Sequence, residues 1–408
     1  MKINNETLTQ TQSKIKKMFL EQVQKGAQSS SLNDKNLLAC GQFLNYLESN
    51  QRGLHGTAAA LRVISHYERD DECKQVVQSL LEYAKSFVEV EKTLDPTSEQ
   101  STIIDDNNIV KKAELLYSLS LIKSGTAADR DALIQKIATD LKNSQTNDGW
   151  SFFSDINKDE IDIIPTAMSV LALHANNCDG YKNGRKFLWD EIEKTKKIED
   201  PETFSKIVLA LYVLVFTANG ELKNHESNYK NILKKIWSSN FAFMNSDIEQ
   251  NIEYPYNTRH FYVRIPWQLY LLAISNKLSY RYSSKVYYFS RLHSILEQTS
   301  EEGFKYLHSG KHISSRTNAI LFDVIEHLKR DRKNIIAITI LNFFDKVLNF
   351  LRNKYVKYFL NFIGLLVIVA SFFLWRGEDK DLLADLAPAF IASFTIYLLV
   401  FNIRPSNN

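Results

Sequence analysis

Two long uncharged apolar runs near the C-terminal end of the printed sequence constrain this chain most. They extend from Tyr358 to Trp375 and from Leu386 to Ile403, and each contains 18 residues. A helix of that length is about 27 Å long, close to the hydrocarbon thickness of a bilayer. Charged residues bracket both runs, which disfavours the alternative of two buried core helices. We therefore expect two transmembrane helices that form a hairpin.

The charges around the hairpin predict its orientation, because Lys and Arg are retained on the cytoplasmic side. The connector Arg376–Asp385 carries two basic and four acidic residues. Neither run contains Asp, Glu, Lys, Arg or His, which argues against a proton-coupled transporter or a voltage sensor. Basic residues precede the first run and follow the second: Lys346, Arg352, Lys354, Lys357 and Arg404. We expect both termini in the cytoplasm.

The remainder of the chain has helical periodicity. The sequence has only 13 Gly and 7 Pro in 408 residues, which argues against a many-stranded β protein. Apolar helices alternate with amphipathic ones, a pattern typical of an inner set buried all round and an outer set half exposed. Six such pairs close as an α/α barrel or stay open as a solenoid, and periodicity alone does not decide. The apolar helices are expected to start at Thr57, Ile109, Pro165, Thr203, Ile265 and Ser315.

These patterns predict an all-α chain with five parts. Residues 1–50 form an N-terminal helical extension, and residues 51–330 form the cytosolic helical domain. Residues 331–357 lead into the hairpin of residues 358–403, either as an amphipathic juxtamembrane segment at the membrane surface or as a last packing helix of the soluble domain, and residues 404–408 form a cytosolic tail. The segment Met1–Lys17 has no apolar core, so we expect no cleaved secretion signal. Cys40, Cys73 and Cys178 have no metal-ligand spacing, which indicates free thiols in a reducing cytosol.

The loops before the apolar helices carry a recurring motif. Asp148-Gly149-Trp150 precedes the helix that starts at Pro165, and Glu302-Gly303-Phe304 precedes the one at Ser315. In these loops and helices, residues 50–330 resemble the terpene-cyclase and prenyltransferase toroid superfamily, most closely over Gln145–Leu173. The resemblance implies an α/α toroid.

The resemblance does not extend to the superfamily's chemistry. Its cyclases protonate an alkene with the central Asp of a DxDD motif, whose clustered carboxylates raise the pKa of that Asp. Here Asp162 matches the first Asp, but Ile164 and Pro165 occupy the other acidic positions. The zinc ligand set of protein prenyltransferases and the reactive Cys of thioester toroids are also absent from the sequence. We expect no catalytic residues, no metal and no cofactor.

The polar residues near the starts of the apolar helices are the remaining candidates for a site. In a closed ring they would gather at one mouth and bind an anionic ligand or a partner. Taken singly, each is more often a surface or capping residue. The candidates are His55, Asp162, Arg259, His260, Arg264, His312 and Arg316.

Two functional interpretations follow. In layout the chain resembles the two-helix transmembrane effectors of bacterial antiphage abortive-infection systems, including retron-associated ones, whose activation damages the inner membrane. This likeness implies a bacterial inner-membrane location, homo-oligomers in the lipid bilayer, and a trigger such as a reverse transcriptase–nucleic acid complex or another defence protein. The alternative is a diverged membrane-bound terpenoid or prenyl cyclase whose apolar substrate arrives from the bilayer.

Overall fold

The computed structural model describes residues 5–28, 54–89, 108–123, 127–146, 148–152, 161–195, 198, 201–218, 222–238, 250–252, 260–262, 267–278, 292, 296–297, 299–300, 303–304 and 315–330. The chain divides into two compact units, and every described residue belongs to the unit Ile3–Ile335. Both apolar runs, with their ends at Tyr358, Trp375, Leu386 and Ile403, lie outside the described residues. No helix within the described ranges combines the length and hydropathy of a membrane span.

The described part of the chain is mainly helical, as the all-α prediction requires. Six helices form the inner set, and buried residues lie on all their sides, although α13 is less apolar in composition than the other five. In the most apolar of them, every residue from Ile164 to Leu173 is buried. Their bounds are α3 Leu54–Ile64, α5 Ile109–Leu119, α7 Ile163–Ala175, α9 Pro201–Phe216, α11 Trp267–Lys277 and α13 Ser315–Arg330.

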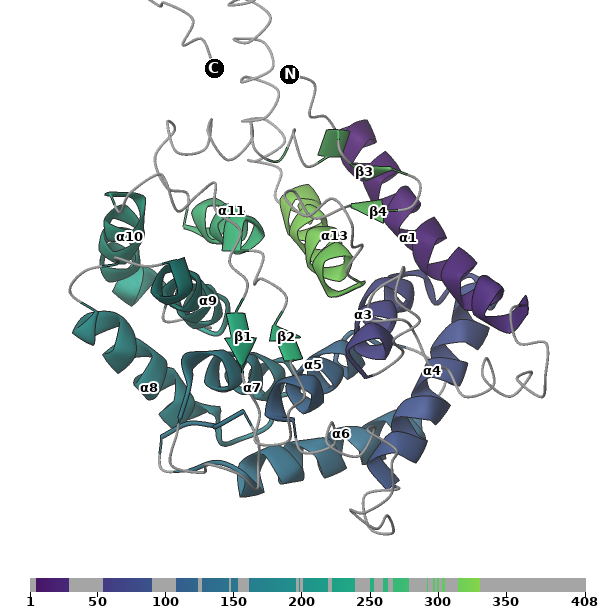
Figure 1. Cartoon of the computed structure of the whole chain (residues 1–408), viewed down its shortest axis with the longest axis horizontal. Helices are drawn as coiled ribbons and strands as arrows, with labels where there is room; N and C mark the ends of the chain where they lie inside the picture. The colour runs from purple at the N-terminus through teal and green to yellow at the C-terminus, as the bar shows by residue number, and fades with distance from the viewer. Residues whose placement is uncertain are drawn as a thin grey trace, which may run out of the picture. The chain divides into compact units, whose positions relative to one another are not determined.

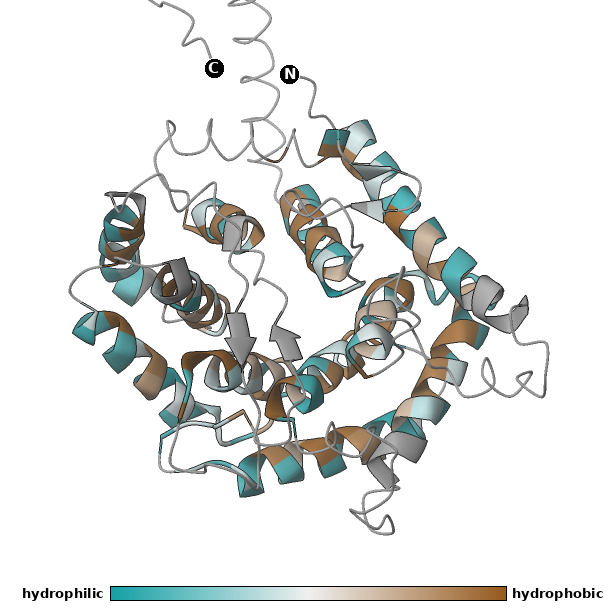
Figure 2. Ribbon diagram, in the orientation of Figure 1, coloured by the Kyte–Doolittle hydropathy of each residue, from teal (hydrophilic) through white to brown (hydrophobic). Residues whose placement is uncertain are grey.

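The other helices are amphipathic. In Figure 2 apolar and polar residues alternate along them, whereas apolar residues predominate in α7 and α9. A short 3-10 helix, Ser65–Tyr67, lies between α3 and the amphipathic helix α4. The bounds of the amphipathic helices are α1 Asn5–Gln28, α4 Asp71–Glu89, α6 Ala127–Asn143, α8 Tyr181–Lys194 and α10 Leu222–Ser238. They place one polar side toward solvent and one apolar side against the inner helices.

The inner helices contact one another in cyclic order. Each of α3, α5, α7, α9 and α11 packs against the next, and α13 packs against both α11 and α3 (Figure 1). The outer helices cover this set: α4 packs on α3, α6 on α5, α8 on α7 and α9, and α10 on α9. Helix α1 completes the layer by packing on α13 and α3. The first and last inner helices are therefore neighbours in space although the whole domain separates them in sequence.

The Asp148-Gly149-Trp150 loop supports the junction between α6 and α7. Trp150 is fully buried, and its indole Nε1 donates a hydrogen bond to the Leu141 carbonyl at 2.6 Å. Its backbone N–H donates to Thr166 Oγ1 at 3.0 Å. A Cβ at position 149 would lie 2.5 Å from Ile161 Cγ2, so only glycine fits between the loop and α7. The motif therefore has a packing role here.

Two short antiparallel ribbons interrupt the helices, which the sequence did not predict. β1 Gln250–Ile252 pairs with β2 His260–Tyr262, and β3 Thr299–Ser300 pairs with β4 Gly303–Phe304. In the second ribbon Gly303 has φ 103°, a backbone conformation that favours glycine. Gly303 and Phe304 of the second motif therefore lie in this ribbon, which packs beside α1 and α13.

Candidate functional site

A cluster of buried charged side chains lies where α3, α5 and α13 meet. The carboxylate of Glu114, whose side chain is 7% exposed, is shared by two partners. His55 Nδ1 contacts Glu114 Oε2, and Arg316 Nε lies 2.5 Å from Glu114 Oε1. His55 and Arg316 stand in the first turns of α3 and α13, so Glu114 of α5 connects the beginnings of the two helices. This end of the cluster is partly open, because the side chain of His55 is 21% exposed.

Burial and contacts within the cluster shift the pKa of Glu114 and that of His55. Burial by itself raises the pKa of Glu114, but the positive charge of Arg316 and the contact with His55 lower it by more, to about 2. Burial is also the largest influence on His55 and lowers its pKa, although Glu114 opposes this effect. At neutral pH the arrangement is therefore a carboxylate held by Arg316, with a neutral His55 donating Nδ1–H to it.

A second buried ion pair lies deeper along the same helices. Arg62 of α3 and Asp323 of α13 contact each other through Nε and Oδ2, and each side chain is 7% exposed. The Arg62 guanidinium also lies 4.8 Å from the centre of the Tyr117 ring. Burial is the largest single influence on Arg62 and lowers its pKa, but Asp323 and the neighbouring tyrosines together raise it by more, so the net shift is upward. The pair is almost completely removed from water.

Aromatic rings from α9, α11 and α13 pack near these charges. The rings of Tyr212 and Tyr270 have centroids 4.5 Å apart, and Tyr212 stacks on Phe216 at the same separation. Phe216 in turn lies 5.0 Å from the ring of His327. Burial raises the pKa of Tyr212 and of Tyr270, so both phenols stay neutral. The inner helices thus meet through aromatic packing and compensated charges.

The surviving acid of the cyclase-like segment has a different environment. Asp162 is the N-cap of α7, and its Oδ1 accepts a hydrogen bond from Ile164 N at 2.8 Å. Its Oδ2 lies 2.7 Å from Lys206 Nζ of α9. These contacts tie Asp162 to α7 and α9 and not to the His55 cluster, so a capping role accounts for this carboxylate.

The sequence prediction placed seven residues together, and the structure describes the side chains of three. His55 and Arg316 share Glu114 as a partner, whereas the described partners of Asp162 lie elsewhere. His260 contributes its backbone to β2, and Arg259, Arg264 and His312 lie outside the described residues. The prediction missed Arg62, Glu114 and Asp323. Their signal was present, since each is a charged residue inside a helix expected to be buried all round.

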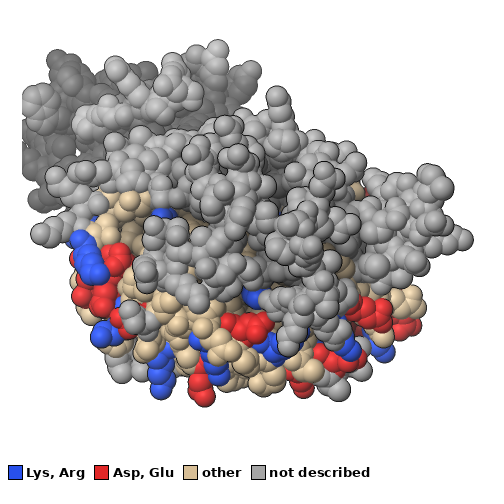
Figure 3. All heavy atoms as spheres, turned by 60° about the horizontal axis from the view of Figure 1, so that its bottom comes forward, with Lys and Arg blue, Asp and Glu red and all other residues tan. Residues whose placement is uncertain are grey.

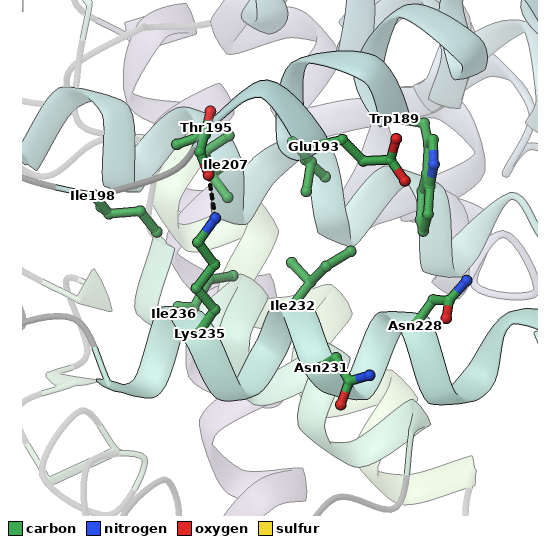
Figure 4. Close-up of a pocket in the computed structure, with 11 residues that line it drawn as sticks. Trp189, Glu193, Thr195, Ile198, Ile207, Asn228, Asn231, Ile232, Lys235 and Ile236 are labelled. Carbon is green, nitrogen blue, oxygen red and sulfur yellow. Dashed lines mark hydrogen bonds between the residues drawn. The ribbon is translucent and has the colours of Figure 1, made fainter.

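A separate groove lies on the outer layer between α8 and α10 (Figure 4). It has a volume of about 270 Å³, at the small end of the range for ligand pockets. Ile207 of α9 contributes to its apolar lining together with Ile192 and Ile236. Figure 4 shows Glu193 beside Trp189 at one end and Lys235 donating to the Thr195 carbonyl at the other. The groove has room for a few side chains.

The described surface and thiols add no reactive centre. In the face shown in Figure 3, acidic and basic side chains are interspersed, so no field of one sign extends across it. Burial raises the pKa of the Cys73 and Cys178 thiols, which keeps both protonated. Within the described ranges, no three His, Cys, Asp or Glu side chains form a group that could hold a metal ion. No family model, curated protein or solved structure matches the chain.

Proposed function

We propose that this chain is a membrane-anchored effector without catalytic activity, in which a helical α/α toroid controls a C-terminal membrane hairpin. In this proposal the toroid responds to a trigger, and the hairpin then disrupts the bacterial inner membrane in an abortive-infection response. Both termini lie in the cytoplasm, and the hairpins of several copies assemble in the bilayer. The trigger is a reverse transcriptase–nucleic acid complex or another defence-system protein.

The cyclic packing of the inner helices supports the toroid. Contact between α13 and α3 is what a closed ring requires, whereas in an open solenoid each helix packs only on its sequence neighbours. The covering of this set by α1, α4, α6, α8 and α10 supports the same architecture.

The ionisation of the buried carboxylates favours a non-catalytic role over that of a cyclase. A cyclase acid must keep its proton at neutral pH in order to protonate an alkene. Among the described inner-helix residues, the buried carboxylates are Glu114 and Asp323, and each is paired with an arginine. The pKa of Glu114 is about 2, so this group holds no proton to donate. Asp162 is engaged as a helix cap.

One observation favours the alternative of a terpenoid or prenyl cyclase. Tyr212, Tyr270 and Phe216 bring aromatic faces together between the inner helices, and such faces stabilise cations. The cyclase would still need a protonated acid. A new terpenoid in lipid extracts of expressing cells, lost on Tyr212→Leu, would establish this alternative.

Inducible expression in a bacterial host tests the proposed function. The full-length chain is compared with a variant that has a charge in each apolar run, Val367→Arg with Ile396→Arg, and with the matched variant Val367→Ala with Ile396→Ala. Growth and membrane potential are followed with a voltage-sensitive dye. We expect the wild-type chain and the alanine variant to depolarise the cells once triggered, and the arginine variant to be harmless, because a charge at the bilayer centre is costly. Equal depolarisation by the arginine variant would refute a membrane-disrupting hairpin.

A further inference from the structure

Helix α13 occupies a special position in the chain. It is the last helix within the described residues, and in sequence it directly precedes the segment that leads to the first apolar run. Its partners come mostly from the other end of the chain, since Asp323 and Arg62 are 261 positions apart and Glu326 and Gln12 are 314 apart. The packing of α13 therefore joins the beginning of the domain to its end.

Polar anchors hold α13 at several levels. Arg316 pairs with Glu114 in its first turn, and Asp323 pairs with Arg62 near its middle. In its last turns Gln12 of α1 bridges two residues of α13: it donates to Glu326 Oε1 at 2.6 Å and accepts from Lys329 Nζ at 2.8 Å.

The joints between the other inner helices are different. Ser118 donates to the Ala58 carbonyl between α5 and α3, and Asn176, which follows α7, donates to the Leu116 carbonyl of α5. The Lys206–Asp162 pair between α9 and α7 is more exposed, at 18% and 23% of the two side chains. Among the ion pairs of the described residues, the two most buried both end on α13.

Buried ion pairs make a joint with two distinct states. While the charges are paired the joint is stable, but a slight separation leaves charges in a low dielectric without partners or water. Complete separation returns all the charges to water, which solvates them well. The joint therefore favours either the docked or the released helix over a partly opened one.

We propose that α13 is a releasable latch: its buried pairs Arg62–Asp323 and Arg316–Glu114 hold the helix against α3 and α5, and its release is the event that frees the segment leading to the hairpin. The coupling to the hairpin rests on the proposed function. The latch itself is a property of α13 and is measured separately.

Hydrogen exchange of the full-length protein in lipid nanodiscs tests the latch. Asp323→Asn leaves the Arg62 charge buried without its counter-ion, and we expect exchange in residues 315–330 to become about 100-fold faster. The double variant Arg62→Met with Asp323→Leu replaces the pair by apolar contacts, and we expect slow exchange to return. The matched control Asp162→Asn weakens the α7–α9 pair and should leave residues 315–330 unchanged. If Asp323→Asn does not fold, Lys329→Ala is measured instead, because it removes the hydrogen bond from α13 to Gln12 of α1.

The outcomes separate the latch from the proposed function. Faster exchange confined to α13 supports the latch, whatever happens to growth; if those cells then keep their membrane potential, the proposed membrane function fails. Exchange that rises equally in α7, α9 and α13, or that rises in α13 with Asp162→Asn as much as with Asp323→Asn, overturns the latch. Unchanged exchange in α13 overturns it as well.

Discussion

Arg62 and Asp323 form an ion pair with side chains only 7% exposed, although 261 positions separate them in the sequence. The pair joins α3 to α13, and the charge of Arg62 also lowers the pKa of the Glu114 carboxylate. The charges of this region therefore act together, and removing one changes the environment of the others.

Replacing Arg62 should destabilise the domain strongly. Arg62→Met leaves Asp323 buried without a partner, for which we expect a loss of about 3–5 kcal/mol in the free energy of unfolding. Thermal and denaturant unfolding followed by circular dichroism measure the loss. Lys194→Met removes an exposed surface partner of Glu191 and should lower the free energy of unfolding far less than Arg62→Met does. Similar losses for the two variants would mean that Arg62 and Asp323 are not buried together.

The stability of the domain should fall in acid. The pKa of Glu114 is about 2 in the folded protein against an ordinary 4.5, so the stabilisation is complete above pH 4.5 and is lost as the pH falls toward 2. The lowered pKa of His55 acts in the same direction below pH 6.5, because folding then opposes its protonation. Unfolding measured from pH 7 to pH 3 should show a decline that Glu114→Gln makes shallower. An equal decline in Glu114→Gln would assign the acid sensitivity to other groups.

Adding a methyl group to Gly149 should strain the loop before α7. Its Cβ would lie 2.5 Å from Ile161 Cγ2 and 2.8 Å from Thr166 Oγ1, so Gly149→Ala should cost about 1–3 kcal/mol of unfolding free energy. Asp148 is exposed beside it, and Asp148→Ala should change stability by no more than about 0.5 kcal/mol. Thermal unfolding of both variants makes the comparison, and a neutral Gly149→Ala would contradict the close packing.

Asp162 should contribute to stability and not to chemistry. Asp162→Ala removes the N-cap of α7 and the partner of Lys206, with an expected loss of about 1–2 kcal/mol. Asp162→Asn keeps a capping oxygen and should lose less. Denaturant unfolding measures both. Any enzymatic product that disappears with Asp162→Asn in a fully folded protein would reinstate a catalytic role for this carboxylate.

The predicted topology places the C-terminal end in the cytoplasm. A reporter fused after Asn408 that is active only in the cytoplasm should give a signal, whereas one active only in the periplasm should not. Replacing two positive charges, by Lys354→Glu and Lys357→Glu, should weaken the preference for a cytoplasmic C-terminal end, since Lys and Arg determine orientation. Periplasmic activity of the unmodified fusion would refute the topology.

Local patterns in the sequence determined much of this protein. The spacing of apolar residues predicted the inner helices to within about three residues at their starts, and the Asp148-Gly149-Trp150 motif marked the loop before α7. Such features depend on neighbours a few positions apart, so they can be deduced from one segment at a time. The short ribbons β1–β2 and β3–β4 have too few residues to give a periodic signal.

Only the tertiary structure decided which charges meet. His55 and Arg316 were predicted to lie at one mouth, but the residue that connects them is Glu114, and Asp162 belongs to another joint. Arg62, Glu114 and Asp323 are charged residues inside inner helices, and burial requires partners for them. Which partner each takes depends on the order in which the helices pack, and α13 beside α3 is a relation between distant segments that no local pattern encodes.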